Sequence, residues 1–318
     1  GVTVGEGTNS VTGNTVLGVN ALDAAVTGTN NTAIGYLTLT SNTSGTECVA
    51  VGSGALSNNT TGEHNTAVGK SALTSNTTAS DNTAVGEASL QNNTTGANNT
   101  SVGRNALISN TTASNNTALG KSTLESNTTG ANNVAIGANA LDANTTAGSC
   151  VAIGKDAAGA NTIGSQITAV GSEALESNTT GNYNVAVGSQ ALQLNTTGAS
   201  NVAMGLQALE ANTTANYNTA VGANSLDANT TASGNTAFGY QTLSSVQTNT
   251  GHTAVGYRAL LNSNGGNNNT AVGYNAGVVI STGGQNVMMG VNTLLSCTTG
   301  SNNVAIGHQA LEDITTNG

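Results

Sequence analysis

The sequence predicts an all-β protein, a parallel β-solenoid (β-roll) of about 18 coils with 17 residues per coil. Three observations predict it. A glycine recurs at a fixed step of 17 residues, without insertion or deletion. An apolar residue precedes that glycine in every repeat. Each repeat also holds a short β-branched stretch bounded by residues typical of turns. Self-similarity at a fixed period indicates a solenoid or array of repeats.

The repeat reads N-[TV]-A-[VI]-G-x-x-A-L-x-x-N-T-T-[GA]-x-x when it is numbered from its asparagine, so that the recurring glycine is position 5. Position 9 is leucine in every repeat except two, which carry Ala158 and Gly277. Charged residues occur only at positions 6, 7, 10, 11, 16 and 17, and we expect these positions to face water. The recurring glycines are Gly18, Gly35, Gly52, Gly69, Gly86, Gly103, Gly120, Gly137, Gly154, Gly171, Gly188, Gly205, Gly222, Gly239, Gly256, Gly273, Gly290 and Gly307.

Strands fit the repeat better than helices. Positions 1 to 5 are too short for a helix, and β-branched residues occupy alternate positions there. Asn-Thr-Thr at positions 12 to 14 disfavours a helix and is typical of a turn or strand edge. We expect two or three short strands per repeat, with coils stacked at about 4.8 Å. Residues 1–13 would form a partial N-terminal coil, and residues 14–318 one continuous solenoid domain.

Glycine and asparagine positions of the repeat indicate which residues lie inside the coil. Glycine at position 5 predicts a positive φ or a place too narrow for a Cβ atom. Asparagine at positions 1 and 12 is replaced mostly by apolar residues, which indicates burial. Buried amides need partners, and stacked asparagines can form an amide ladder along the column. The alternative is an exposed turn asparagine.

The first strand has two different faces, because side chains alternate along a strand. Positions 2 and 4 carry Thr or Val and Val or Ile, whereas positions 1, 3 and 5 carry Asn, Ala and Gly. If the small residues line the interior, the Val/Ile face is an apolar stripe that predicts a seam between chains. If the Val/Ile face lines the interior, the solenoid can stand alone. The candidate seam comprises Val68, Val85, Val102, Leu119, Ile136, Ile153, Val170 and Val187.

The composition argues against several classes of function. Five basic residues and a net charge of −10 leave no basic patch for nucleic acid. No run of about 18 apolar residues is present, so we expect no membrane insertion. His64, His252 and His308 occupy different repeat positions, which predicts no catalytic set and no enzyme. Cys48, Cys150 and Cys297 lack metal-site spacing, and we expect buried thiols that act as small hydrophobes and no cofactor.

Two side-chain columns are candidate binding surfaces. Tyr240, Tyr257 and Tyr274 share position 6 in successive repeats, beside Gln241 and Arg258, and predict an exposed stripe that contacts carbohydrate or another fibre chain. Carboxylates recur at position 10, where neighbouring pairs could hold Ca²⁺ or simply form a solvated acidic edge. These carboxylates are Asp23, Glu125, Asp142, Glu176, Glu210, Asp227 and Glu312.

The stretches NTAVGKSAL, NVAIGANAL and NTAVGYRAL resemble two known groups of proteins. One is the head region of trimeric autotransporter adhesins, whose S-V-A-I-G repeats fold as left-handed parallel β-rolls associated in threes. The other is the NTAVGYQAL…NTTG repeat of phage and environmental-bacterial fibre proteins. The resemblance runs from Asn14 to Gly318 and implies a trimer on a cell surface, on a virion or in the extracellular space. The repeat is longer than the usual adhesin-head repeat, and Asn-Thr-Thr is not part of that motif.

These observations predict a non-enzymatic fibre subunit that associates with copies of itself laterally, end to end, or both. Neither end of the sequence shows a recognisable cap, which favours end-to-end pairing or a longer fibre. The alternatives are an ice-binding surface made of threonine columns and a carbohydrate-binding surface for surface glycans. An ice-binding face needs two regular outward threonine columns, and adjacent positions 13 and 14 diverge if that stretch is extended.

Overall fold

The protein is all-β. The computed structural model describes residues 4–5 and 10–315, and its described residues form strands and turns without a helix. The chain divides into two compact units, residues 1–163 and 164–318, which are described separately. The first unit contains β1 (Val4–Gly5), β2 (Thr15–Leu17), β3 (Thr32–Ile34), β4 (Val49–Val51), β5 (Thr66–Val68), β6 (Thr83–Val85), β7 (Thr100–Val102), β8 (Thr117–Leu119), β9 (Val134–Ile136) and β10 (Val151–Ile153). The second contains β11 (Thr168–Val170), β12 (Val185–Val187), β13 (Val202–Met204), β14 (Thr219–Val221), β15 (Thr236–Phe238), β16 (Thr253–Val255), β17 (Thr270–Val272), β18 (Val287–Met289) and β19 (Val304–Ile306).

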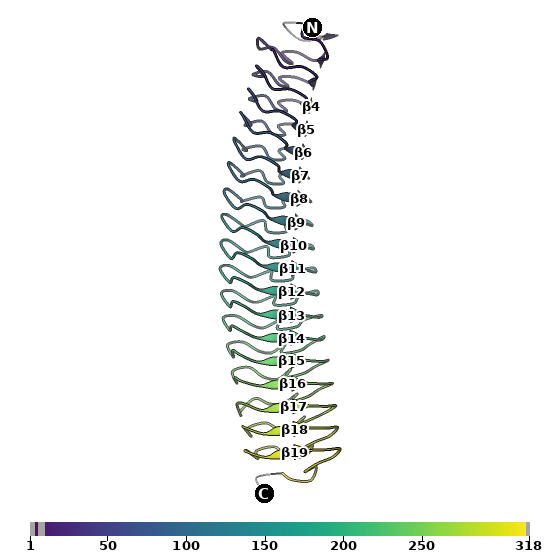
Figure 1. The fold of residues 1–318 in the computed structure, drawn as a ribbon, viewed down its shortest axis with the longest axis vertical. Helices are drawn as coiled ribbons and strands as arrows, with labels where there is room; N and C mark the ends of the chain where they lie inside the picture. The colour runs from purple at the N-terminus through teal and green to yellow at the C-terminus, as the bar shows by residue number, and fades with distance from the viewer. Residues whose placement is uncertain (1–3, 6–9, 316–318) are drawn as a thin grey trace. The chain divides into compact units, whose positions relative to one another are not determined.

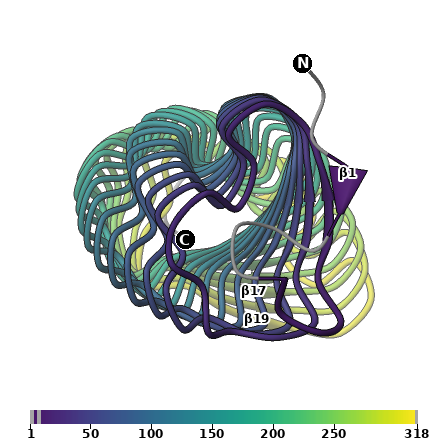
Figure 2. The ribbon, with the colours of Figure 1, turned by 90° about the horizontal axis from the view of Figure 1, so that it is seen from above.

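Each unit is a parallel β-solenoid, as predicted. Strands β2 to β10 pair in chain order in the first unit, and β11 to β19 do the same in the second (Figure 1). The register is position for position, so Thr66 lies opposite Thr83 and Val68 opposite Val85. Successive coils within a unit follow nearly the same path when viewed along the stack (Figure 2). Because successive coils stack position on position, one extra residue in a coil would move every later side chain out of register with the coil before it. This explains the strict period.

The expectation of two or three strands per coil is wrong, because each coil has one strand at positions 2 to 4. Positions 7 and 9 have left-handed backbone instead, with φ of 59° at Ser71 and 51° at Leu73. Hydrogen bonds between coils nevertheless continue around the turn. Ser71 N–H donates to the Ser53 carbonyl of the coil before (2.9 Å), and Leu73 N–H to the Ser89 carbonyl of the coil after (3.1 Å). Left-handed residues thus replace the later strands while the backbone groups stay paired.

The core of each coil is narrow and made of small residues. Alanine at positions 3 and 8 and leucine at position 9 are fully buried, as shown by Ala67, Ala72 and Leu73 at 0% exposure. One leucine and two alanines fill a coil that has no room for an aromatic ring. The single Phe of the sequence, Phe238, is 42% exposed and lies outside this core.

Glycine at position 5 has a positive φ and, where a further coil follows, no room for a Cβ atom. Gly86 has a φ of 132°, and a Cβ atom there would lie 2.6 Å from the carbonyl oxygen of Gly103 in the next coil. A side chain at this position would therefore be strained and would also collide with backbone.

The asparagine columns are buried, and the amide ladder is confirmed at position 12. Asn76 Nδ2 donates to Asn59 Oδ1 (2.8 Å) and to the Ala79 carbonyl (2.9 Å). Position 1 uses its amide differently. Asn65 Oδ1 accepts from the N–H of Asn82 (3.0 Å), and Asn65 Nδ2 donates to Ala79 (2.8 Å). The two columns together fix the corner at position 15 from both sides.

The segment expected as a partial N-terminal coil, residues 1–13, is described at residues 4–5 and 10–13. Val4 and Gly5 form β1, which pairs antiparallel with β2 through Val4–Leu17 and Gly5–Val16. This pair departs from the parallel register expected there. The single continuous domain over 14–318 stays a prediction.

Candidate functional site

The outer face of the strands is the largest regular surface in each unit. We define the outer face as the side chains of positions 2 and 4. Alanine at position 3 points inward, so positions 2 and 4 point outward. Val68 is 37% exposed and Leu119 46% exposed in the first unit, and Phe238 is 42% exposed in the second. The structure thus selects the first predicted arrangement, with the small residues inside and the Val/Ile side chains outside.

Each predicted seam residue is the last residue of its strand, and each is half-buried or exposed. In the first unit these are Val68, Val85, Val102, Leu119, Ile136 and Ile153; in the second they are Val170 and Val187. Pairing between neighbouring strands stacks them in a continuous column within each unit. A contiguous apolar column is unusual on the surface of a protein that stays alone in water.

The position 6 tyrosines of three successive coils, Tyr240, Tyr257 and Tyr274, form a stack, which we call the tyrosine ladder. The ring centroids of Tyr240 and Tyr257 are 5.6 Å apart at an interplanar angle of 19°, and those of Tyr257 and Tyr274 are 5.0 Å apart at 8°. The Arg258 guanidinium carbon lies 6.0 Å from the Tyr257 centroid. Offset stacking of this kind is favourable for aromatic rings.

The stacking limits how the ladder can contact a sugar. A pyranose ring binds to the flat face of an aromatic ring, and both faces of Tyr257 are occupied by its neighbours. Only ring edges and the outer faces of Tyr240 and Tyr274 remain. The predicted stripe can therefore stack against a sugar ring only at its two ends.

No protein-family model matches this chain, and no curated protein matches it.

The histidines do not come together. His252 is fully buried at position 1, where its Nδ1 accepts from the N–H of Asn269 (3.3 Å) as an asparagine oxygen does in other coils. Desolvation by burial lowers the pKa of His252 to about 4, against a smaller raising effect from the Gly266 backbone. The exposed His64 lies between two carboxylates, with Nδ1 3.3 Å from Asp81 and Nε2 3.7 Å from Glu47. These carboxylates lie on opposite sides of the imidazole ring, so the trio cannot chelate one ion.

The position 10 carboxylates do not assemble a metal site in the described part of the chain, where no group of three His, Cys, Asp or Glu side chains is placed to hold an ion. Burial raises the pKa of Asp142, with smaller contributions from Asp156 and Glu125. The three cysteines are buried thiols outside any disulfide, and burial also raises the pKa of Cys48.

The threonine columns differ in exposure. At position 13 the hydroxyl group donates to the carbonyl of the next coil, as Thr60 does to Thr77 (2.9 Å), and these side chains are mostly half-buried. At position 14 most threonines are exposed. Of these two columns, position 14 therefore presents most of the unengaged hydroxyl groups. The asparagines of the Asn-Thr-Thr sequences are buried in the ladder, so they are inaccessible to glycosylation.

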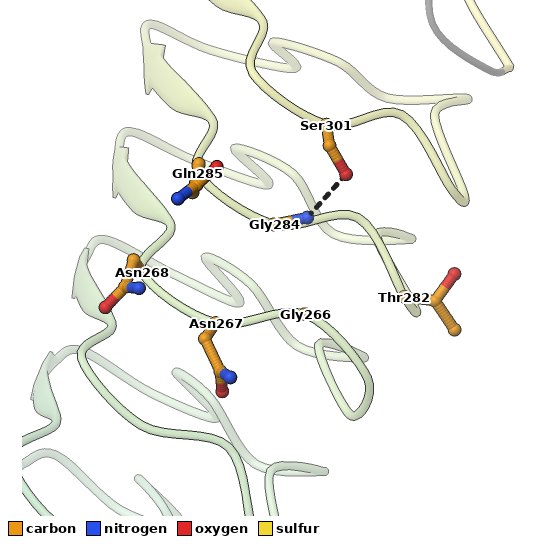
Figure 3. Close-up of a pocket in the computed structure, with 7 residues that line it drawn as sticks. All are labelled: Gly266, Asn267, Asn268, Thr282, Gly284, Gln285 and Ser301. Carbon is orange, nitrogen blue, oxygen red and sulfur yellow. Dashed lines mark hydrogen bonds between the residues drawn. The ribbon is translucent and has the colours of Figure 1, made fainter.

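A shallow polar hollow of about 310 Å³ lies on the second unit (Figure 3). It opens where position 16 is Gly284. The Ser301 hydroxyl of the next coil accepts from the Gly284 N–H (3.1 Å). Gly284 has no side chain that could accept from the Asn267 N–H in the same way. Its walls carry amide and hydroxyl groups and no charge. The residues are Gly266, Asn267, Asn268, Thr282, Gly284, Gln285 and Ser301. Sequence reasoning missed this hollow, and the signal was a single glycine, Gly284, at position 16 between Asn267 and Ser301.

Among the described residues no helix has the length and hydropathy needed to cross a membrane.

Proposed function

We propose that the protein is a non-enzymatic structural subunit of an extracellular, cell-surface or virion-borne fibre, and that its chains associate laterally through the outer face. The observation that carries this proposal is the column of apolar side chains at position 4, which are half-buried or exposed in each unit although alanine fills the core. Burying such a column against a second copy removes apolar surface from water, at roughly 25 cal/mol per Å².

The backbone arrangement supports a load-bearing role. Backbone hydrogen bonds join successive coils at strand and turn positions alike. The buried side-chain amides of position 12 add further hydrogen bonds between the same coils. Repetitive axial pairing of this kind makes solenoids resistant to local unfolding. The surface setting and the three-fold symmetry rest on the resemblance to adhesin heads and fibre repeats.

Light scattering on the purified chain tests the proposal. The mass of one chain is 30.9 kDa. We expect a mass near three chains, or a very large and polydisperse mass if association is end to end. A variant with Val68, Leu119 and Ile153 replaced by threonine places β-branched side chains, which suit a strand, at all three positions while making the face polar, and we expect it to dissociate. The matched control replaces Thr61, Thr78 and Thr95 by serine on the exposed position 14 column. A monomeric wild type would refute lateral and end-to-end association together.

A carbohydrate-binding surface is the second candidate, favoured by the exposed ends of the tyrosine ladder. Ice binding has less support, because the position 13 hydroxyl groups donate to backbone carbonyls. Thermal hysteresis above that of buffer would restore ice binding as a candidate.

A further inference from the structure

The two ends of the tyrosine ladder differ from its middle. Tyr257 is 39% exposed, whereas Tyr240 is 46% and Tyr274 is 50% exposed. The middle ring has a ring on each side, so the additional exposure at the ends belongs to rings with one stacked neighbour. Tyr240 and Tyr274 therefore each have one face without a stacked ring.

At the Tyr240 end, the position 6 column is interrupted by one small residue. Position 6 of the preceding coil is Ala223, and position 6 of the coil before that is Leu206, which is 50% exposed. Two coil steps separate Leu206 from Tyr240, or roughly 10 Å. A ring placed above the Ala223 methyl would be about 5 Å from each, within the range of offset stacking. We call this place the vacant rung.

The Tyr274 end is less suited to a ligand. Position 6 of the next coil there is Val291, a branched side chain that is 40% exposed and stands where a stacked ring would lie. An alanine leaves that space open, and a valine occupies much of it.

Polar and apolar groups flank the vacant rung on opposite sides. Position 7 of the three coils carries amides, at Gln207, Asn224 and Gln241. Position 4 of two of these coils carries Met204 and Phe238, which are 43% and 42% exposed. None of positions 4, 6 and 7 in these coils is charged. An aromatic face, an apolar side and a row of amide donors and acceptors are the features of a site for a neutral ring that carries hydroxyl groups.

We propose that the vacant rung between Leu206 and Tyr240 binds a neutral pyranose ring of a glycan. The apolar face of the sugar stacks on Tyr240 as the next rung of the ladder, and its hydroxyl groups meet the position 7 amides. This proposal rests on the carbohydrate-binding candidate above and gives it a place. The site requires one chain, and its apolar side, Met204 and Phe238, belongs to the outer face.

The test uses the full chain and four probes, the methyl pyranosides of glucose, galactose, mannose and N-acetylglucosamine. Saturation-transfer NMR and titration of the tyrosine ring resonances measure binding. We expect at least one probe to bind and to shift the ring signals of Tyr240. Ala223→Tyr fills the rung with the protein's own ring, as Tyr257 and Tyr274 already do at position 6, and should weaken binding at least tenfold. Tyr240→Ala should weaken it by about fivefold to tenfold.

The matched control is Ala138→Tyr, the same substitution at position 6 of a coil in the first unit. It should leave binding unchanged. Circular dichroism and the molar mass should match the wild type in all three variants, which separates loss of the site from loss of the fold or of association. Absence of binding by all four probes, or equal binding by wild type and Ala223→Tyr, would overturn the proposal.

Discussion

The Asn110 side chain joins three coils: its Nδ2 donates to Asn93 Oδ1 at 2.9 Å, and its Oδ1 accepts from Asn127 Nδ2 at 3.0 Å. These residues lie 17 positions apart in the sequence and stack directly in the structure. The ladder is fully buried, so each amide depends on its neighbours for its hydrogen bonds.

Replacing Asn110 by alanine should therefore destabilise the coils around it. The change removes three hydrogen bonds and leaves polar groups of Asn93 and Ala113 buried without that partner. We expect a loss of about 2–4 kcal/mol. Amide hydrogen exchange of coils 99–115 and 116–132 measures it locally, which suits a repeat array that does not unfold in two states. Thr112→Ala, on the exposed position 14 column, is the control. Equal protection in both variants would contradict a role for the ladder.

Replacing Gly86 by alanine should destabilise its coil, because Gly86 has a φ of 132° and the new Cβ would lie 2.6 Å from the Gly103 carbonyl oxygen. We expect about 2–4 kcal/mol, from backbone strain and collision together. Gly54→Ser is the control. Ser71 occupies the same repeat position at a φ of 59°, and a Cβ at Gly54 would have its nearest neighbour at 3.9 Å. Chemical denaturation should show a much larger shift for Gly86→Ala, and equal shifts would count against the close packing of this column.

Acid should weaken the second unit through His252. Its pKa is about 4 in the folded chain and about 6.5 when unfolded, so the unfolded chain binds the proton first as pH falls. The contribution of His252 is thus present above pH 6.5 and is lost between pH 6.5 and 4, by up to about 3 kcal/mol.

The variant His252→Asn isolates that contribution, because asparagine is the usual residue of position 1 and does not titrate. Stability measured at pH 7 and pH 4 should fall less in the variant than in the wild type. Comparing the two also removes the opposite effect of Asp142 and Asp227, whose raised pKa values favour the folded chain as pH falls. The same pH dependence in both proteins would show that His252 is not the titrating group.

The exposed charges of position 6 should matter little. Glu87 lies 4.0 Å from the Lys70 ammonium and 3.6 Å from the Arg104 guanidinium, and all three side chains are more than half exposed. Solvent screens such pairs, so Glu87→Gln should change unfolding stability by no more than about 0.5 kcal/mol. Denaturation in low and high salt checks this, and a larger, salt-sensitive loss would indicate a stronger network.

The period of 17, the coil and the buried columns could be predicted from the residues alone. Stacking in register places the same position of every repeat in the same environment. The mostly apolar residues that replace asparagine at position 12 in some repeats therefore indicate that the whole column is buried, as Asn59, Asn76 and Asn93 are. The backbone constraint at the position 5 glycines could be predicted for the same reason, because glycine recurs there in every repeat.

Only the tertiary structure decided which face of the strand is inside. The alternation of side chains places Ala67 and Val68 on opposite faces of the strand but does not determine which face is buried. In the structure the narrow coil closes around Leu73 with Ala67 inside and Val68 outside. The left-handed backbone at Leu73 was also unpredictable, because leucine has no preference for positive φ. The vacant rung beside Tyr240 likewise depends on stacking, since only a coil-by-coil column brings Leu206, Ala223 and Tyr240 together.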